Sequence, residues 1–377
     1  MLSIFNLHTG SQAAVLPPDW PGNFWFHMLV FIAILFVFVI LGVMAFIYIE
    51  RRILGRFQIR IGPNRTGPFG IIQPVADTIK ILIKEDIIPH NADGLLHLLA
   101  PAIAFIPALL IFAVIPLQDG AALADLNIGI LYIVAISSVG TVGILMAGWA
   151  SNNKYGLLGA MRVIAEVVSY EIPLALSIIG VVLLTGNLSM SSIVASQNIP
   201  FILLQPLGFI IYFVAALAEI NRTPFDLLDA ESEIVAGFNI EYSGIKFALF
   251  YLTEYSEALA ISAIISTIYL GGWRGPLLPP VLWLLIKMIA VFIVIIWIRS
   301  TLPRIRIDHV MAFAWKCLLP LALINLLITG LQVITLSDIS QWVIVAINFV
   351  VAAVLILLWS RFYRLTGNKL SGEKIEV

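Results

Sequence analysis

Acidic side chains crowd into one short stretch of the chain, residues 219–254. Its carboxylates are Glu219, Asp226, Asp229, Glu231, Glu233, Glu241 and Glu254. Acids spaced this closely repel one another and raise some of each other's pKa values, so protons can be shared near neutral pH. The apolar residues between them argue against a simply solvated acidic loop. If Thr223 or Pro224 begins a helix, Arg222 and Asp226 are partners four residues apart on it. The pattern suits proton transfer, and it equally suits the binding of a cation.

Other acids lie inside apolar segments. Arg162 and Glu166 are four residues apart, Glu171 follows in the same segment, and Glu257 is three residues beyond Glu254 on one helical face. A charged side chain at the centre of a bilayer costs about 2.5–3.5 kcal/mol, so these groups should be protonated, paired or hydrated. We therefore add Glu166, Glu171 and Glu257 to the candidate proton path.

A basic segment follows the first apolar stretch. Residues 51–70 combine five arginines with glycine and proline, which predicts a structured loop. Residues 71–86 have the spacing of an amphipathic helix, with Asp77 and Lys80 on its polar side. Two interpretations stay open: a loop that only fixes topology, or the wall of an opening for a lipid-like ligand.

A second basic loop, residues 299–309, contains Arg299 and Arg304. Anchoring at the membrane surface explains its charge. The alternative is that these two arginines face the acidic stretch or a ligand.

The elements that must position these residues are membrane helices. Hydrophobic residues make up 61% of the 377-residue chain, the mean hydropathy is +1.04, and apolar runs of about twenty residues recur. The sequence predicts an all-α, polytopic helical membrane protein, one membrane domain over residues 1–377, with about nine transmembrane helices plus the amphipathic helix. The predicted spans are 24–49, 98–117, 129–150, 163–185, 203–219, 247–271, 280–298, 311–332 and 341–360.

Basic residues orient the chain. Placing residues 51–97 and 220–246 in the cytoplasm leaves only Arg274 of the 21 lysines and arginines in an outer loop, with Lys287 and Lys316 inside spans. The positive-inside rule then predicts the N-terminus outside and the C-terminus inside. The N-terminal residues lack lysine and arginine, so no cleaved leader is expected.

Cofactor chemistry is not expected within the chain itself. A single cysteine, Cys317, cannot hold an iron–sulfur cluster, and no two histidines have metal-ligand spacing. Nucleotide-binding and nucleophile motifs do not occur. We expect no metal, flavin or iron–sulfur cluster here and no nucleic-acid partner.

Four stretches closely resemble the quinone-cavity membrane subunit of the proton-pumping NADH:quinone oxidoreductases, respiratory complex I. They are ERRILGRFQIRIGPNRTGPFGIIQPVADTIKILIKED (50–86), RVIAEVVSYE (162–171), AEINRTPFDLLDAESEIVAGFNIEYSGIKFALFYLTEY (218–255) and IRSTLPRIRID (298–308). They occur in the family's order and cover most of the chain.

The resemblance implies a membrane subunit that frames a quinone cavity at an interface with other subunits. Those partners are the peripheral-arm iron–sulfur and quinone-site subunits, small membrane subunits and antiporter-like subunits, embedded with lipid in a bacterial plasma (inner) membrane. By position, residues of the cavity and its surrounding loops are Glu50, Arg51, Gln58, Arg60, Asp77, Lys80, Arg299 and Arg304. The acids of residues 219–254, with Glu171, match the family's path that couples quinone reduction to proton translocation. The chain would therefore belong to an enzyme, a translocase, without a redox centre of its own.

The chain departs from the family pattern at three acids. Glu166 stands where the family usually has glutamine, Asp229 replaces a glutamate and follows Leu228 where proline is common, and Glu257 is not expected. These departures change the geometry of the proton path and suggest additional acid capacity.

Alternatives remain. One is the equivalent membrane subunit of an energy-converting hydrogenase, which needs no quinone, although the 50–86 stretch and INRTPFDLLDAESE favour the quinone branch. A stand-alone proton or cation transporter is compatible with composition alone, and a purely structural anchor is the simplest alternative.

Overall fold

The computed structural model describes residues 24–119, 122–227, 237–335 and 340–370, and within these ranges the fold is entirely helical. The first half contains α1 (Phe24–Phe57), η2 (Pro68–Gly70), α2 (Gln73–Ile83), α3 (Gly94–Leu110), η3 (Ile111–Ala113), α4 (Gly129–Ala150) and α5 (Lys154–Thr185). The second half contains α6 (Met190–Ser196), α7 (Phe201–Leu204), α8 (Pro206–Glu219), α9 (Gly244–Ile268), α10 (Pro280–Thr301), α11 (Ile307–Phe313), the π-helical turn η4 (Ala314–Leu318), α12 (Leu319–Thr335) and α13 (Gln341–Leu370). The predicted all-α membrane fold is confirmed.

Eight of the predicted apolar segments form helices long and apolar enough to cross a membrane. The remaining segment, predicted as 203–219, contains α7 and the 14-residue helix α8. At about 1.5 Å per residue, α8 alone is shorter than a hydrocarbon core of about 30 Å. The number of spans and their orientation therefore stay predictions.

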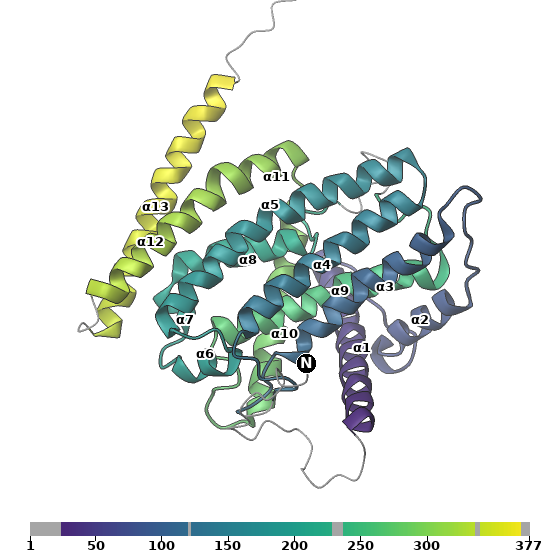
Figure 1. The fold of residues 1–377 in the computed structure, drawn as a ribbon, viewed down its shortest axis with the longest axis horizontal. Coiled ribbons are helices and arrows are strands. Elements are labelled where there is room, and N and C mark those ends of the chain that lie inside the picture. The colour runs from purple at the N-terminus through teal and green to yellow at the C-terminus, as the bar shows by residue number, and fades with distance from the viewer. Residues whose placement is uncertain (1–23, 120–121, 228–236, 336–339, 371–377) are drawn as a thin grey trace, which may run out of the picture.

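The helices α8 and α9 form the centre of the bundle. Among the long helices α9 has the largest buried share, and it packs against α1, α3 and α10, while α8 packs against α5. Figure 1 shows α3, α4, α5, α8 and α9 running alongside one another, with α2 at one end of the bundle and α12 and α13 together at its flank. The charged residues of α8 and α9 thus lie within the bundle.

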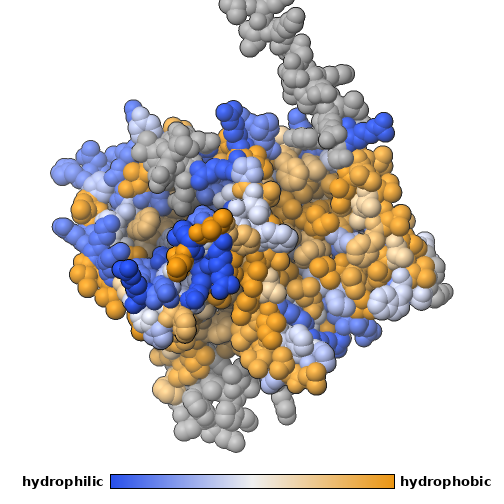
Figure 2. All heavy atoms as spheres, turned by 180° about the vertical axis from the view of Figure 1, so that it is seen from behind, coloured by the Kyte–Doolittle hydropathy of each residue, from blue (hydrophilic) through white to orange (hydrophobic). Residues whose placement is uncertain are grey.

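The outer surface is largely apolar. In Figure 2 hydrophobic residues cover a broad band of one face, and hydrophilic residues gather mainly along its left and upper margins. Exposed large side chains on α10 and α13, including Trp297, Trp342 and Phe349, belong to this surface. Such a surface is expected for helices that face lipid.

The basic segment differs from its prediction. Residues 51–57 are not a loop, because α1 continues without interruption to Phe57. The amphipathic helix is shorter than 71–86 and spans Gln73–Ile83. The turn between them depends on Gly70, whose φ is +79° and at which a Cβ would lie 2.3 Å from the carbonyl oxygen of Pro63. The helical extension carries Glu50 and Arg51 toward α9 and α2.

Candidate functional site

A buried arginine joins two carboxylates from different helices. Arg222 follows α8, is 2% exposed, and donates from Nη1 to Oε1 of Glu50 on α1 at 2.8 Å. Its Nε lies 2.9 Å from Oε1 of Glu254 on α9, and Arg299 of α10 pairs with the same oxygen of Glu50. Two arginines and two glutamates therefore form one ionic cluster where α1, α9, α10 and the segment after α8 meet.

Electrostatics keep this arginine charged. Burial lowers the pKa of Arg222, but Glu254 and Glu50 outweigh it, so the net pKa is raised above the ordinary value. The guanidinium also lies over the ring of Tyr255, 4.4 Å from its centroid. Because the raised pKa lies far above neutrality, the contribution of Arg222 to stability persists across the physiological range and is lost only at extreme alkaline pH.

Two further ion pairs surround the cluster. Arg51 of α1 pairs with Asp77 of α2, which fixes the amphipathic helix against α1. Arg304, after α10, lies 3.2 Å from Asp226. Arg304 therefore faces the acidic stretch, as the second interpretation of the 299–309 loop has it, whereas Arg299 pairs with Glu50, which lies outside that stretch.

Beyond Glu254 the acids continue into a cavity of about 50 Å³. Glu219 of α8 and Glu257 of α9 both line it, together with Ser137 and Tyr212. The volume has room for a few water molecules, since one water needs about 10–15 Å³ of such space. Glu254 and Glu257 are three residues apart on α9, so this helix connects the ionic cluster to the cavity.

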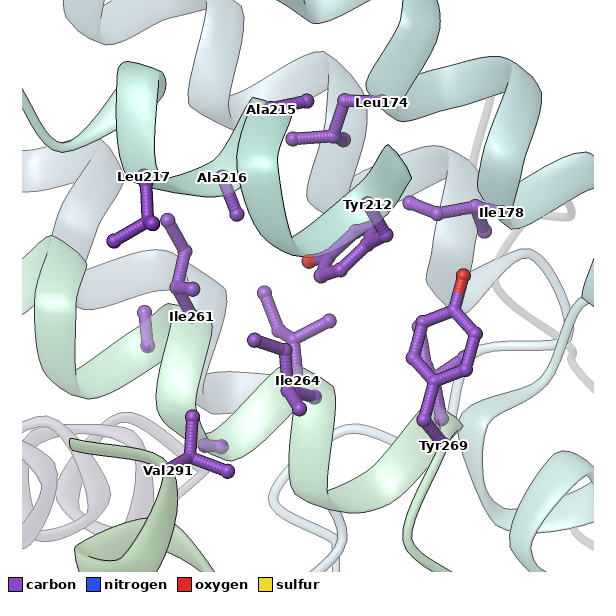
Figure 3. Close-up of a cluster of buried hydrophobic side chains, with 14 of the residues drawn as sticks. Leu174, Ile178, Tyr212, Ala215, Ala216, Leu217, Ile261, Ile264, Tyr269 and Val291 are labelled. Carbon is purple, nitrogen blue, oxygen red and sulfur yellow. The ribbon is translucent and has the colours of Figure 1, made fainter. Parts of the chain in front are cut away.

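Apolar side chains from α5 and α9 also line this cavity. Leu174 and Ile178 of α5 and Ile264 of α9 are among them. Figure 3 shows these three side chains gathered around Tyr212. The cavity is therefore partly polar and partly apolar.

Two acids of α5 lie in contrasting surroundings. Glu171 accepts a hydrogen bond from the hydroxyl of Ser138. Glu166 is completely buried, and neither of its carboxylate oxygens has a hydrogen-bond partner among the described residues. Burying a polar group without a hydrogen-bond partner is costly, so Glu166 is an unusual residue within α5.

The structure does not bring all candidate residues together. Gln58 accepts from Nε of Arg60 at 2.7 Å on the exposed segment after α1, and Lys80 is exposed on α2. Glu241 accepts instead from Asn153 at 2.7 Å, in a separate polar cluster. Asp229, Glu231 and Glu233 lie outside the described residues.

The expected pairing of Arg222 with Asp226 on a new helix is wrong. Residues 222–227 form turns rather than a helix, so the two side chains are not neighbours on one face. Arg222 binds Glu50 and Glu254, which are remote in sequence. Only the tertiary fold determines this choice of partners.

A buried cluster that sequence reasoning missed fixes the segment after α2. Lys246 at the start of α9 pairs with Asp86 at 2.9 Å, and its Nζ lies 3.4 Å from Nδ1 of His97. The His97 ring stacks on Tyr242 with centroids 4.0 Å apart, and burial raises the pKa of Tyr242, which keeps the phenol neutral. In the sequence, a lysine within the first turn of a long apolar helix was a sign that such a buried cluster could form.

Replacing Lys246 by methionine should loosen the segment between α2 and α3. The change removes the partner of Asp86 and of His97 while keeping an apolar stem, so residues 84–93 lose a buried attachment. Trypsin should then cut after Lys84 several-fold faster. Lys154→Met, at an exposed position over the Tyr155 ring, is the matched control and should leave cleavage unchanged. Equal cleavage of both variants and the wild type would contradict this role.

Metal-ligand chemistry is not indicated in the described part of the chain, where no group of three or more histidine, cysteine, aspartate or glutamate side chains could hold an ion. The ionic cluster and the acid cavity are instead suited to moving charge and protons.

The described residues thus form an all-helical membrane protein with a buried ionic cluster next to an acid-lined cavity. Residues 30–330 match the family model described as NADH dehydrogenase. The chain belongs to this family, and its curated relatives are named as the H subunit of NADH-quinone oxidoreductase.

Three of these relatives illustrate the similarity. The H subunit from Dehalococcoides mccartyi (strain CBDB1) is 63% identical over 349 residues, covering 93% of this chain and 99% of the relative. That of Geobacillus kaustophilus is 48% identical, covering 83% and 95%, and that of Brevibacillus brevis is 46% identical, covering 84% and 95%. The similarity therefore extends over nearly the whole length of these relatives.

Proposed function

We propose that this chain frames the quinone-binding cavity of a proton-translocating NADH-quinone oxidoreductase and links quinone reduction to proton translocation. The relatives' name supplies the reaction of the whole complex. Quinone is the substrate, and it is reduced at an interface with partner subunits that hold the redox centres. The chain works as a multi-pass subunit of the bacterial plasma (inner) membrane, beside peripheral-arm, small membrane and antiporter-like subunits.

In this proposal, the quinone cavity is formed by the end of α1 together with α2 and α10. Charged and polar residues there offer hydrogen bonds to a quinone headgroup, while exposed Val75 and Ile79 on α2, with Ile72 just before it, provide apolar contact for its tail. The proposed cavity and loop residues are Glu50, Arg51, Gln58, Arg60, Asp77, Lys80, Arg299 and Arg304.

The proposed coupling of quinone reduction to proton translocation rests mainly on one observation: Arg222 forms ion pairs with both Glu50 and Glu254. A charge change near Glu50 alters how strongly Arg222 holds Glu254, and Glu254 leads along α9 to the acid cavity. Electron transfer to quinone beside Glu50 would thereby change proton affinity at Glu257 and Glu219. The proposed path comprises Glu166, Glu171, Glu219, Asp226, Asp229, Glu231, Glu233, Glu241, Glu254 and Glu257.

Glu219→Gln tests this function in the assembled complex. Glutamine keeps the size and polarity of the side chain but cannot carry a proton, so proton translocation should fall by about tenfold or more. Quinone-dependent NADH oxidation and acidification of proteoliposomes measure the two halves of the reaction.

Asp119→Asn, an exposed acid after α3, is the control and should leave both rates unchanged. Retention of full turnover and full acidification by Glu219→Gln in an assembled complex would refute the proton role. Purification of the chain without flavin- and iron–sulfur-containing partners would refute the proposed assembly.

A further inference from the structure

Two buried polar groups at the far end of the bundle are complementary and unsatisfied. Gln205, which precedes α8, is 3% exposed, and Asn325 of α12 is 7% exposed. Neither the Oε1 acceptor of Gln205 nor the Nδ2 donor of Asn325 has a hydrogen-bond partner among the described residues. Leaving a buried donor and acceptor unmatched is costly, so something should satisfy both.

The two groups lie close to each other, beside two glycines. A Cβ built on Gly208 of α8 would lie 3.1 Å from Nδ2 of Asn325 and 3.3 Å from Oε1 of Gln205. A Cβ built on Gly180 of α5 would lie 3.2 Å from the same Oε1 and 3.5 Å from the same Nδ2. Because both atoms lie within 3.3 Å of one such point, a single small molecule can reach the acceptor and the donor together.

A small cavity adjoins both amide side chains. Its volume is about 10 Å³, and its polar lining consists of Gln205, Asn325, Thr329, Gln332 and Asn348. That volume matches a single water molecule, which needs about 10–15 Å³ of such space and two or more polar partners. A bare cation does not fit the amide donor, and an apolar ligand satisfies neither group.

We propose that this junction binds one water molecule, which donates to Oε1 of Gln205 and accepts from Nδ2 of Asn325. The site is independent of the proposed proton path. It lies between α5, α8 and α12, where α8 begins, whereas the acidic residues Glu219 and Glu257 line a different cavity.

The water completes a polar network that attaches the last two long helices to the bundle. Nε2 of Gln205 donates to the carbonyl of Gly180 at 3.0 Å and to the hydroxyl of Thr329 at 3.1 Å. Nδ2 of Asn348 on α13 donates to the carbonyl of Leu204 at 2.6 Å, and Asn348 also pairs with Gln332 of α12. Polar contacts between helices are the main directional attraction available inside a membrane.

A density map of the assembled complex at a resolution that shows ordered water tests the proposal. The wild type should show one peak about 2.7–3.2 Å from both amide atoms. Gly208→Ala should remove the peak, because its Cβ would lie against both groups. Gly330→Ala is the matched control on α12, where a Cβ meets no atom within 4 Å, and it should retain the peak.

Thermal denaturation gives a second measurement that does not depend on the map. Asn325→Leu removes the donor and should lower the melting temperature of the complex, with quinone turnover of the remaining assembled enzyme unchanged. A direct hydrogen bond between Gln205 and Asn325 in the wild-type map, without a peak between them, would overturn the proposal. A peak in the Gly208→Ala map at the wild-type position would overturn it too.

Discussion

Replacing Arg222 by methionine is expected to destabilise the protein by about 3–5 kcal/mol, because the buried carboxylate of Glu50 and the partly buried one of Glu254 both lose an ion-pair partner. Methionine preserves much of the apolar stem but leaves Glu254 without this partner and Glu50 with Arg299 alone. Thermal melting of the purified complex and its quinone turnover measure the loss. Lowering the pH should restore part of the stability, because protonation removes the uncompensated negative charge.

Two comparisons separate this effect from a general loss of charge. Arg304→Met breaks a pair whose arginine side chain is 31% exposed, so its cost should be about 1 kcal/mol or less. Glu50→Gln combined with Arg222→Met should be less damaging than the sum of the single changes, since it removes one of the stranded charges. Equal losses for Arg222→Met and Arg304→Met would contradict the buried-cluster interpretation.

Hydropathy was sufficient to predict the fold class, because an apolar run of about twenty residues has few alternatives in a membrane. Helix ends were harder to predict. Glu50 to Arg56 are polar enough to suggest a loop, yet α1 continues through them, because Arg51 meets Asp77 and Glu50 meets Arg222. Tertiary ion pairs thus overrode the local polarity.

The sequence could predict individual residues of the candidate site, but it could not predict which of them pair with one another. Spacing alone places Glu254 and Glu257 on one face of a helix. No spacing rule joins Glu50 to Arg222, which are 172 positions apart. The helical interpretation of the segment after α8 even gave Arg222 the wrong partner, Asp226, because short-range pairing was the only contact the sequence could suggest.

Ile178 lies next to two polar regions of the bundle. Its side chain is 2% exposed and lines the cavity of Glu219 and Glu257. Two residues further along α5, the carbonyl of Gly180 accepts the hydrogen bond from Gln205. Tyr269 donates from its hydroxyl to the carbonyl of Gly208 at 3.5 Å, within this second region. We infer that the apolar side chain of Ile178 is part of a barrier between the two regions.

Ile178→Asn should make this barrier permeable to protons. A buried amide recruits water, and hydration would join the acid cavity to the polar junction around Gln205. Proteoliposomes with the variant complex should lose an imposed pH gradient several-fold faster than the wild type. Ile178→Ala also enlarges the cavity but adds no polar group at this position, and Ile179→Asn places the same amide at a side-chain position that is 43% exposed. Both control variants should retain the pH gradient. If either leaked as fast as Ile178→Asn, cavity volume or added polarity alone would explain the leak. Hydration of the barrier would then not determine proton permeability.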